Sequence, residues 1–88
     1  MGYVYLGLVE KDPDSAWGIW IPDLPGCLPA ADELEDLPRI AAEVLRQHVE
    51  ALQSDGRPVP APRPLAEVMY DETVREAVKA GATTILIS

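Results

Sequence analysis

Side chains of opposite faces alternate at a period of two in three segments, a fourth segment resumes an extended path after a turn, and together they predict four β-strands. The predicted strands are residues 3–11, 16–21, 27–30 and 82–88. A turn cluster at 12–15 separates the first two strands and is short enough for a hairpin. Pro29 restricts the third strand to an edge of the sheet, because proline has no N–H to donate to a ladder.

A stripe of apolar residues at helical spacing predicts one long helix between residues 32 and 54. The stripe consists of Leu34, Leu37, Ile40, Ala41, Val44, Leu45, Val49 and Leu52. Because the ring of Pro38 would clash with the carbonyl of Leu34, we expect a loose turn at 33–36 and regular helix from about residue 36. Gly56 is expected to cap the helix at its C-terminal end.

The segment from 57 to 64 carries four alternating prolines, which predicts an extended strap that crosses the molecule back to the sheet. A single helical turn at 65–69 and a short helix at 72–80, capped by Asp71, precede the last strand. The order is therefore β-β-β-α-(α)-β. We expect an α+β fold of two layers, with the long helix on one face of a four-stranded sheet and the other face uncovered.

A stiff corner follows the second predicted strand, and the rest of the chain is expected to pack around it. Its residues are Pro22, Asp23, Leu24, Pro25, Gly26 and Cys27. The two prolines fix φ, Gly26 can take a positive φ, and the Asp23 carboxylate can accept hydrogen bonds from N–H groups just ahead of it. Cys27 is the only cysteine and has no neighbouring Lys or His to lower its pKa, so we expect a buried apolar role for it.

The charge balance is acidic, with fifteen Asp and Glu against seven Lys and Arg and a net charge of −8. This charge opposes binding to nucleic acid and suits either a basic protein partner or plain solubility. The chain shows no signal peptide and no apolar run of membrane-spanning length, so we expect a soluble cytoplasmic protein. Its 88 residues bury a thin core, which makes a homo-oligomer, a dimer or a tetramer, an expectation as well.

No set of residues carries a specific catalytic signal. His48 stands alone at the border of the apolar stripe, and the acidic run at 32–36 suits a helix N-terminus. A metal-dependent nuclease would need carboxylates at strand centres, where the predicted strands are apolar. We therefore expect no enzymatic activity, no cofactor and no metal site.

The aromatic residues are the candidates for a partner-binding or oligomer surface. Trp17 and Trp20 lie on opposite faces of one predicted strand, so one of them faces the uncovered side of the sheet. Tyr3 and Tyr5 share one face of the first strand. The alternative is a shallow apolar cluster under the proline-rich strap, and the strand register is needed to decide between the two interpretations.

Several motifs resemble HicB-family antitoxins. They are Glu-Lys-Asp at 10–12, Trp-Gly-Ile-Trp-Ile-Pro-Asp-Leu-Pro-Gly-Cys at 17–27, Asp-Glu-Leu-Glu-Asp-Leu at 32–37, and the helix end at 52–56 with prolines after it. The resemblance covers about residues 3–64 and, more weakly, the terminal strand. It implies a partial ribonuclease-H-like fold without nuclease activity, whose last strand lies parallel beside the first and makes the sheet mixed. It also implies that the domain binds and neutralises a HicA-type toxin, a small basic RNA-cleaving protein.

Two features depart from the family pattern. Pro38 and Glu33 interrupt the usual helix start, and no helix-turn-helix or ribbon-helix-helix segment follows the fourth predicted strand. We therefore expect residues 1–88 to form a single HicB-like domain with no C-terminal DNA-binding domain and no direct contact with nucleic acid. The alternatives are an orphan relative that works as an oligomeric small-molecule-binding or structural protein, and a minimal metal-dependent nuclease.

Overall fold

The computed structural model describes residues 3–11 and 13–88, and the predicted order of elements is confirmed there. The elements are β1 (Tyr5–Lys11), β2 (Trp17–Trp20), β3 (Ala30–Ala31), η1 (Leu34–Asp36), α1 (Leu37–Ser54), α2 (Leu65–Val68), α3 (Glu72–Lys79) and β4 (Thr83–Ile87). Asp12, part of the predicted turn between β1 and β2, lies outside the described residues. No helix in the described part of the chain is long and apolar enough to cross a membrane.

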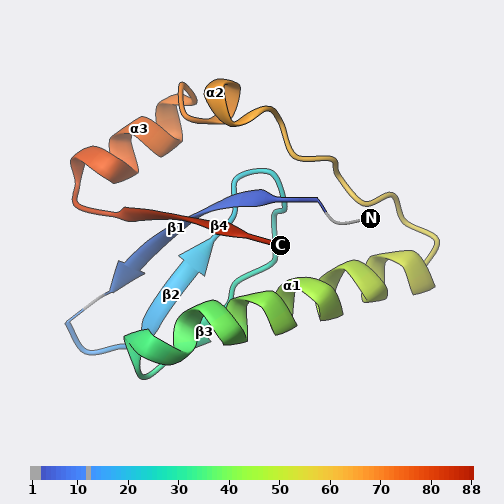
Figure 1. Ribbon diagram of the computed structural model, residues 1–88, viewed down its shortest axis with the longest axis horizontal. Helices are drawn as coiled ribbons and strands as arrows, with labels where there is room; N and C mark the ends of the chain where they lie inside the picture. The colour runs from blue at the N-terminus through green and yellow to red at the C-terminus, as the bar shows by residue number, and fades with distance from the viewer. Residues whose placement is uncertain (1–2, 12) are drawn as a thin grey trace.

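The sheet has the order β3-β2-β1-β4, and all of its pairs are antiparallel (Figure 1). The predicted mixed sheet, with the last strand parallel to the first, was therefore wrong. The reason is the path after α1, which ends beside the start of β1. A direct connection would enter β4 parallel to β1, but the strap and the two short helices first carry the chain to the other end of the sheet (Figure 1).

The long helix begins as the proline predicts. η1 is a 3₁₀ turn at the expected loose start, and α1 carries Pro38 in its first turn, where a missing N–H costs no helical hydrogen bond. Gly56 follows the helix with a φ of 70°, as expected of a glycine cap. α1 lies on one face of the sheet and buries a continuous core against it. The buried members of this core are Tyr5, Val9, Ile19, Ile21, Leu24, Cys27, Ala31, Leu37, Ala41, Leu45 and Ile87.

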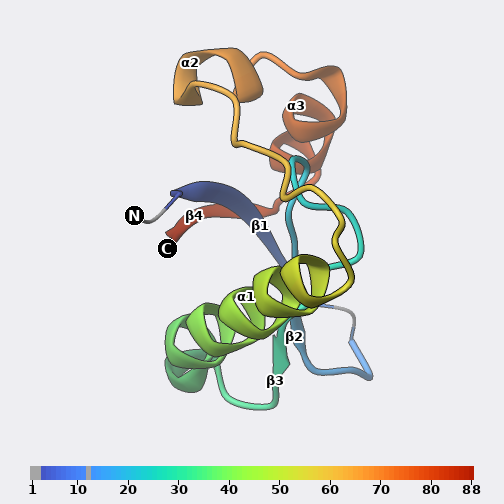
Figure 2. The ribbon, with the colours of Figure 1, turned by 90° about the vertical axis from the view of Figure 1, so that its right-hand side faces the viewer.

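The second face of the sheet is partly covered, which corrects the expectation that it has no cover. α2 and α3 lie on this face, on the side opposite α1 (Figure 2). They bury Leu6 and Leu8 of β1 against Val68 and Val74. The amphipathic pattern of 72–80 indicates a helix with an apolar side, but no local pattern indicates which face of the sheet that side covers. These helices mainly cover β1, and α3 contacts this strand directly.

Candidate functional site

The predicted corner exists and is held by its own backbone. The N–H of Leu24 donates to the carbonyl of Ile21 at 3.0 Å, and the N–H of Cys27 donates to the carbonyl of Leu24 at 3.3 Å. Gly26 takes a φ of 89°, the left-handed conformation expected there. Leu24 and Cys27 point into the core, and burial raises the pKa of the Cys27 thiol. The corner is thus held by its own backbone hydrogen bonds at the end of β2 and encloses the Cys27 thiol.

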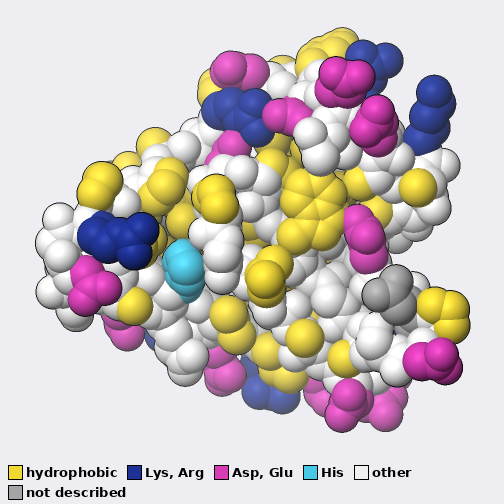
Figure 3. Space-filling view, turned by 180° about the vertical axis from the view of Figure 1, so that it is seen from behind, with side chains coloured by type: hydrophobic (Ala, Val, Ile, Leu, Met, Phe, Trp, Pro, Cys, Tyr) yellow, Lys and Arg dark blue, Asp and Glu magenta, His cyan; other side chains and the backbone are white. Residues whose placement is uncertain are grey.

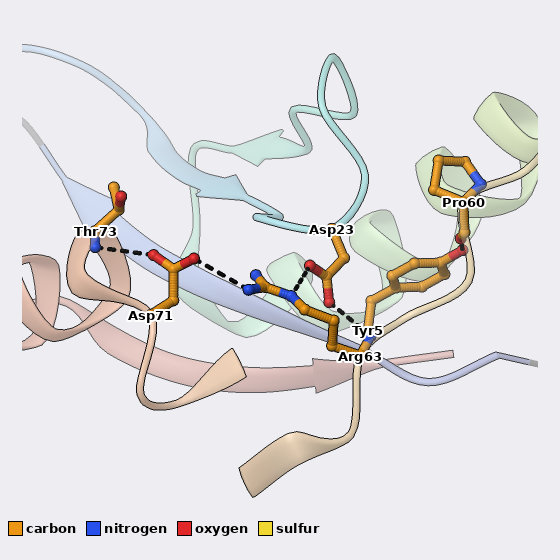
Figure 4. Close-up of polar contacts among 6 residues, drawn as sticks. All are labelled: Tyr5, Asp23, Pro60, Arg63, Asp71 and Thr73. Carbon is orange, nitrogen blue, oxygen red and sulfur yellow. Dashed lines mark hydrogen bonds and ion pairs between the residues drawn. The ribbon is translucent and has the colours of Figure 1, made fainter. Parts of the chain in front are cut away.

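The sequence predicted that the Asp23 carboxylate bonds N–H groups of the turn just ahead of it. In the structure it instead accepts hydrogen bonds from the strap. Its two carboxylate oxygens accept the backbone N–H of Arg63 at 2.9 Å and the Arg63 Nε–H at 2.7 Å (Figure 4). The prolines of the corner hold its backbone so that the carboxylate faces the strap. Arg63 was missed because the strap also holds Arg57, and nothing in the sequence distinguishes the two.

Arg63 also ties the corner to α3. Its Nη1 donates to Asp71 at 3.2 Å, and Asp71 caps α3 by accepting the N–H of Thr73 at 2.9 Å (Figure 4). The hydrogen bond with Asp23 is the main cause that raises the pKa of Arg63, and the bond from Arg63 is the main cause that lowers the pKa of Asp71. We call Asp23, Arg63 and Asp71 the Arg63 clamp. It fixes the strap between the corner and the small helices.

The four aromatic candidates do not meet on one surface. The prediction that Trp17 and Trp20 face opposite sides is confirmed, since Trp17 packs on the α1 core and Trp20 on the cluster under α3. Tyr5 is 1% exposed, and its hydroxyl donates to the Pro60 carbonyl at 2.5 Å, so it fixes the strap within the chain and is not available at the surface (Figure 4). Tyr3 stays partly exposed and packs edge-on against Tyr5.

A groove lies beside Trp20 on the face opposite α1, where the small helices do not reach. It has a volume of about 270 Å³, and we call it the Trp20 groove. It is lined by Glu10, Ser15, Ala16, Gly18, Ile19, Trp20, Leu28, Pro29 and Ala30. Seen from behind, apolar side chains gather across the middle of the molecule, and most acidic side chains lie toward its rim (Figure 3). Leu28 is 68% exposed, a large apolar side chain that no core cluster of the described residues includes.

The described part of the chain contains no group of side chains that could bind a metal ion. Within residues 3–11 and 13–88, no three His, Cys, Asp or Glu side chains gather closely enough to hold a metal ion. His48 is half-buried beside the corner, with its Cε1 3.6 Å from the position that a Cβ on Gly26 would take. This histidine therefore packs against the corner, as expected of one at the border of an apolar stripe. The features that remain for function are the open groove and the acidic charge.

Comparison with known proteins places the chain among antitoxins. The family model for the HicB-like antitoxin of bacterial toxin-antitoxin systems matches residues 5–85. A chain of the HicA3 and HicB3 toxin-antitoxin complex has a TM-score of 0.76 at 24% identity, over 97% of this chain and 95% of that chain. The N-terminal domain of the Burkholderia pseudomallei antitoxin HicB has a TM-score of 0.72 at 27% identity, over 97% and 95%.

A longer Burkholderia pseudomallei antitoxin HicB chain has a TM-score of 0.74 at 26% identity, and the match covers 99% of this chain but 63% of that one. Among curated proteins, none matches this chain. The similarity therefore concerns a unit that corresponds to the N-terminal domain of the Burkholderia protein.

Proposed function

The chain belongs to the HicB-like antitoxin family of bacterial toxin-antitoxin systems, and from this premise we propose that it neutralises a HicA-type toxin by covering the toxin's RNA-contacting surface. The observation that carries the proposal is the family match over residues 5–85, which includes every helix and reaches into β4. Proteins of this family neutralise their toxins without being enzymes. The chain accordingly acts by binding.

The charge of the chain suits this mechanism. A HicA-type toxin, as the resemblance describes it, is small and basic because it must hold the phosphates of RNA. A chain with a net charge of −8 is attracted to the same cationic surface that RNA uses. Once bound, it excludes RNA both by occupying the surface and by neutralising its charge. The toxin's catalytic histidine is then closed off from substrate.

The test combines the purified chain with a HicA-type toxin and follows cleavage of a labelled RNA. We expect cleavage to stop at one equivalent of the chain, and the affinity to fall as salt is raised. Cleavage that continues in the presence of excess folded chain would contradict the proposal. The chain alone, with RNA, DNA or a hybrid in Mg²⁺ or Mn²⁺, is the control. Cleavage that co-purifies with it and is lost in Asp23→Ala would indicate an enzyme instead.

We propose as well that the chain forms a homo-oligomer, a dimer or a tetramer. What supports this is the outer edge of the sheet, since β4 contains neither a charged residue nor a proline to discourage pairing. Leu86 on this strand is 56% exposed. Light scattering after size exclusion at micromolar concentration is the test. A clean monomer mass that tenfold dilution or raised salt leaves unchanged would rule the oligomer out.

A further inference from the structure

The geometry points to the Trp20 groove as the docking site for the toxin: we infer that a lysine or arginine side chain of the toxin enters it. The stem of that side chain lies along the apolar lining, and its cation lies beside the indole face and the Glu10 carboxylate. This inference rests on the proposed function and specifies which surface performs it.

The groove exists because the sheet lacks both cover and side-chain bulk there. Gly18 and Ala30 are paired across β2 and β3 and form a low floor between the larger walls of Trp20 and Leu28. Gly18 is not required by the backbone, because its φ is not positive. A Cβ added to Gly18 would meet only the Glu10 carbonyl oxygen at 3.9 Å, an ordinary contact. The space above Gly18 is therefore open, and a methyl group would fit into the fold while filling part of the groove.

The charge of the groove is negative. Glu10 is the one charged side chain of its lining, and it accepts the Trp20 Nε1–H at 2.5 Å. This hydrogen bond holds the carboxylate at the edge of the indole ring. An aromatic face beside a carboxylate is a favourable environment for a cation, and the long stems of lysine and arginine favour apolar walls. The adjoining hollow contains one cation, Arg63, which Asp23 and Asp71 already bind.

Two other occupants fit less well. A second copy of the chain docked here about a two-fold axis would bring two Glu10 carboxylates and two net charges of −8 together. RNA would meet the same carboxylates with its phosphates. A basic protein is attracted by the features that repel both of these. The free edge of β4 lies at the opposite side of the sheet from β3, so an oligomer formed there leaves the groove open.

The decisive experiment compares two lysines placed at opposite edges of the sheet, Leu28→Lys in the groove and Leu86→Lys on β4. Both replaced side chains are large, apolar and exposed, by 68% and 56%. Binding to the same HicA-type toxin that tests the proposed function is measured by calorimetry. We expect Leu28→Lys to weaken binding at least tenfold and Leu86→Lys less than threefold. Equal affinities for the two variants would overturn the inference and leave the antitoxin function standing. Failure of the unmodified chain to bind would overturn both.

Two milder variants test shape and charge separately. Gly18→Ala fills the floor of the groove, and Glu10→Gln removes the charge while its amide oxygen still accepts from Trp20. Both are expected to melt near the parent temperature and to bind the toxin several-fold more weakly. Glu10→Gln should also reduce the salt dependence of the affinity. Parent-like affinity and salt dependence in both variants would contradict the inference, even if Leu28→Lys had an effect.

Discussion

The two faces of the sheet are packed to different degrees. On one face, the 18 residues of α1 cover β1, β2 and β3 and bury eleven residues in one core. On the other face, the 8 residues of α3 and the single turn of α2 bury four. The first face fixes the fold. The second buries part of β1 and, at Trp20, part of β2, and it leaves β3 without cover from α2 or α3.

The largest effect should follow from damage to the α1 face. Leu45 is 5% exposed in the middle of α1, and Leu45→Ala leaves a cavity in the main core. We expect the free energy of unfolding to fall by about 2–5 kcal/mol, measured by urea denaturation. Gln47→Ala, on the exposed side of the same helix, is the control and should change it by less than about 0.5 kcal/mol. Similar values for the two variants would remove the distinction between the faces.

A smaller and more local loss is expected on the other face. Val74 is fully buried under α3, and Val74→Ala removes two methyl groups, which costs about 2 kcal/mol. Because α3 covers only part of the sheet, its amides should exchange with solvent faster while those of α1 stay protected. Val78→Ala, at a position 42% exposed, is the control. Equal acceleration in α1 and α3 would mean that the two faces unfold as one unit.

The Arg63 clamp joins the two faces, and its loss should have a moderate effect. Asp23→Ala removes the acceptor for two bonds from Arg63. We expect a loss on the order of 1 kcal/mol in the free energy of unfolding and a lower melting midpoint, with no loss of a reaction. Asp14→Ala, in the exposed turn after β1, is the matched control. A melting midpoint in Asp23→Ala equal to that of the control would contradict a role for the clamp.

The smallest expected effect is a loss of folding stability at low pH, through protonation of Asp71. The bond from Arg63, and then the N–H of Thr73, lower the pKa of Asp71 in the folded chain below its ordinary value of 3.8. A lowered folded pKa stabilises the fold above the unfolded pKa, and this contribution is lost as the pH falls through the folded value. Urea midpoints of the parent and of Asp71→Asn should therefore converge as the pH falls from 5 toward 2.5. A difference that stays constant over this range would exclude the linkage.

The elements could be predicted from the sequence, but their arrangement could be predicted only in part. Local patterns located β1, β2, β4 and α1, and Pro38 and Gly56 marked where α1 begins and ends. The third strand was predicted at 27–30, but β3 lies at Ala30–Ala31, because the chain stays in the corner through Cys27 before it pairs with β2. The direction of β4 depends on how the strap and the short helices route the chain, and no local pattern encodes that route. The expectation that only one face is covered was wrong for the same reason, because the apolar side of α3 predicts a packed helix but not the face of the sheet on which it packs.

At the candidate site, too, features set by neighbouring residues could be predicted, and contacts between distant residues could not. The alternation in β2 placed Trp17 and Trp20 on opposite faces correctly, since it depends on neighbours in the chain. Tyr5 was taken for a surface candidate, because alternation cannot say which face a helix covers. The bond between Asp23 and Arg63 joins residues forty positions apart, and only the folded path brings them together. Local chemistry was therefore predictable, and long-range pairing was not.

The position of β4 has a consequence for the order in which the chain folds as it leaves the ribosome. β1 is an inner strand whose neighbours come from opposite ends of the described chain, β2 almost at once and β4 after every other element. During synthesis β1 therefore keeps one unpaired edge until the strap, α2 and α3 have emerged. That edge is a template for any extended segment nearby, whether in the same chain or in another being translated beside it. Pairing of β4 is thus the event that satisfies both edges of β1, and it moves the exposed edge of the sheet from β1 to β4.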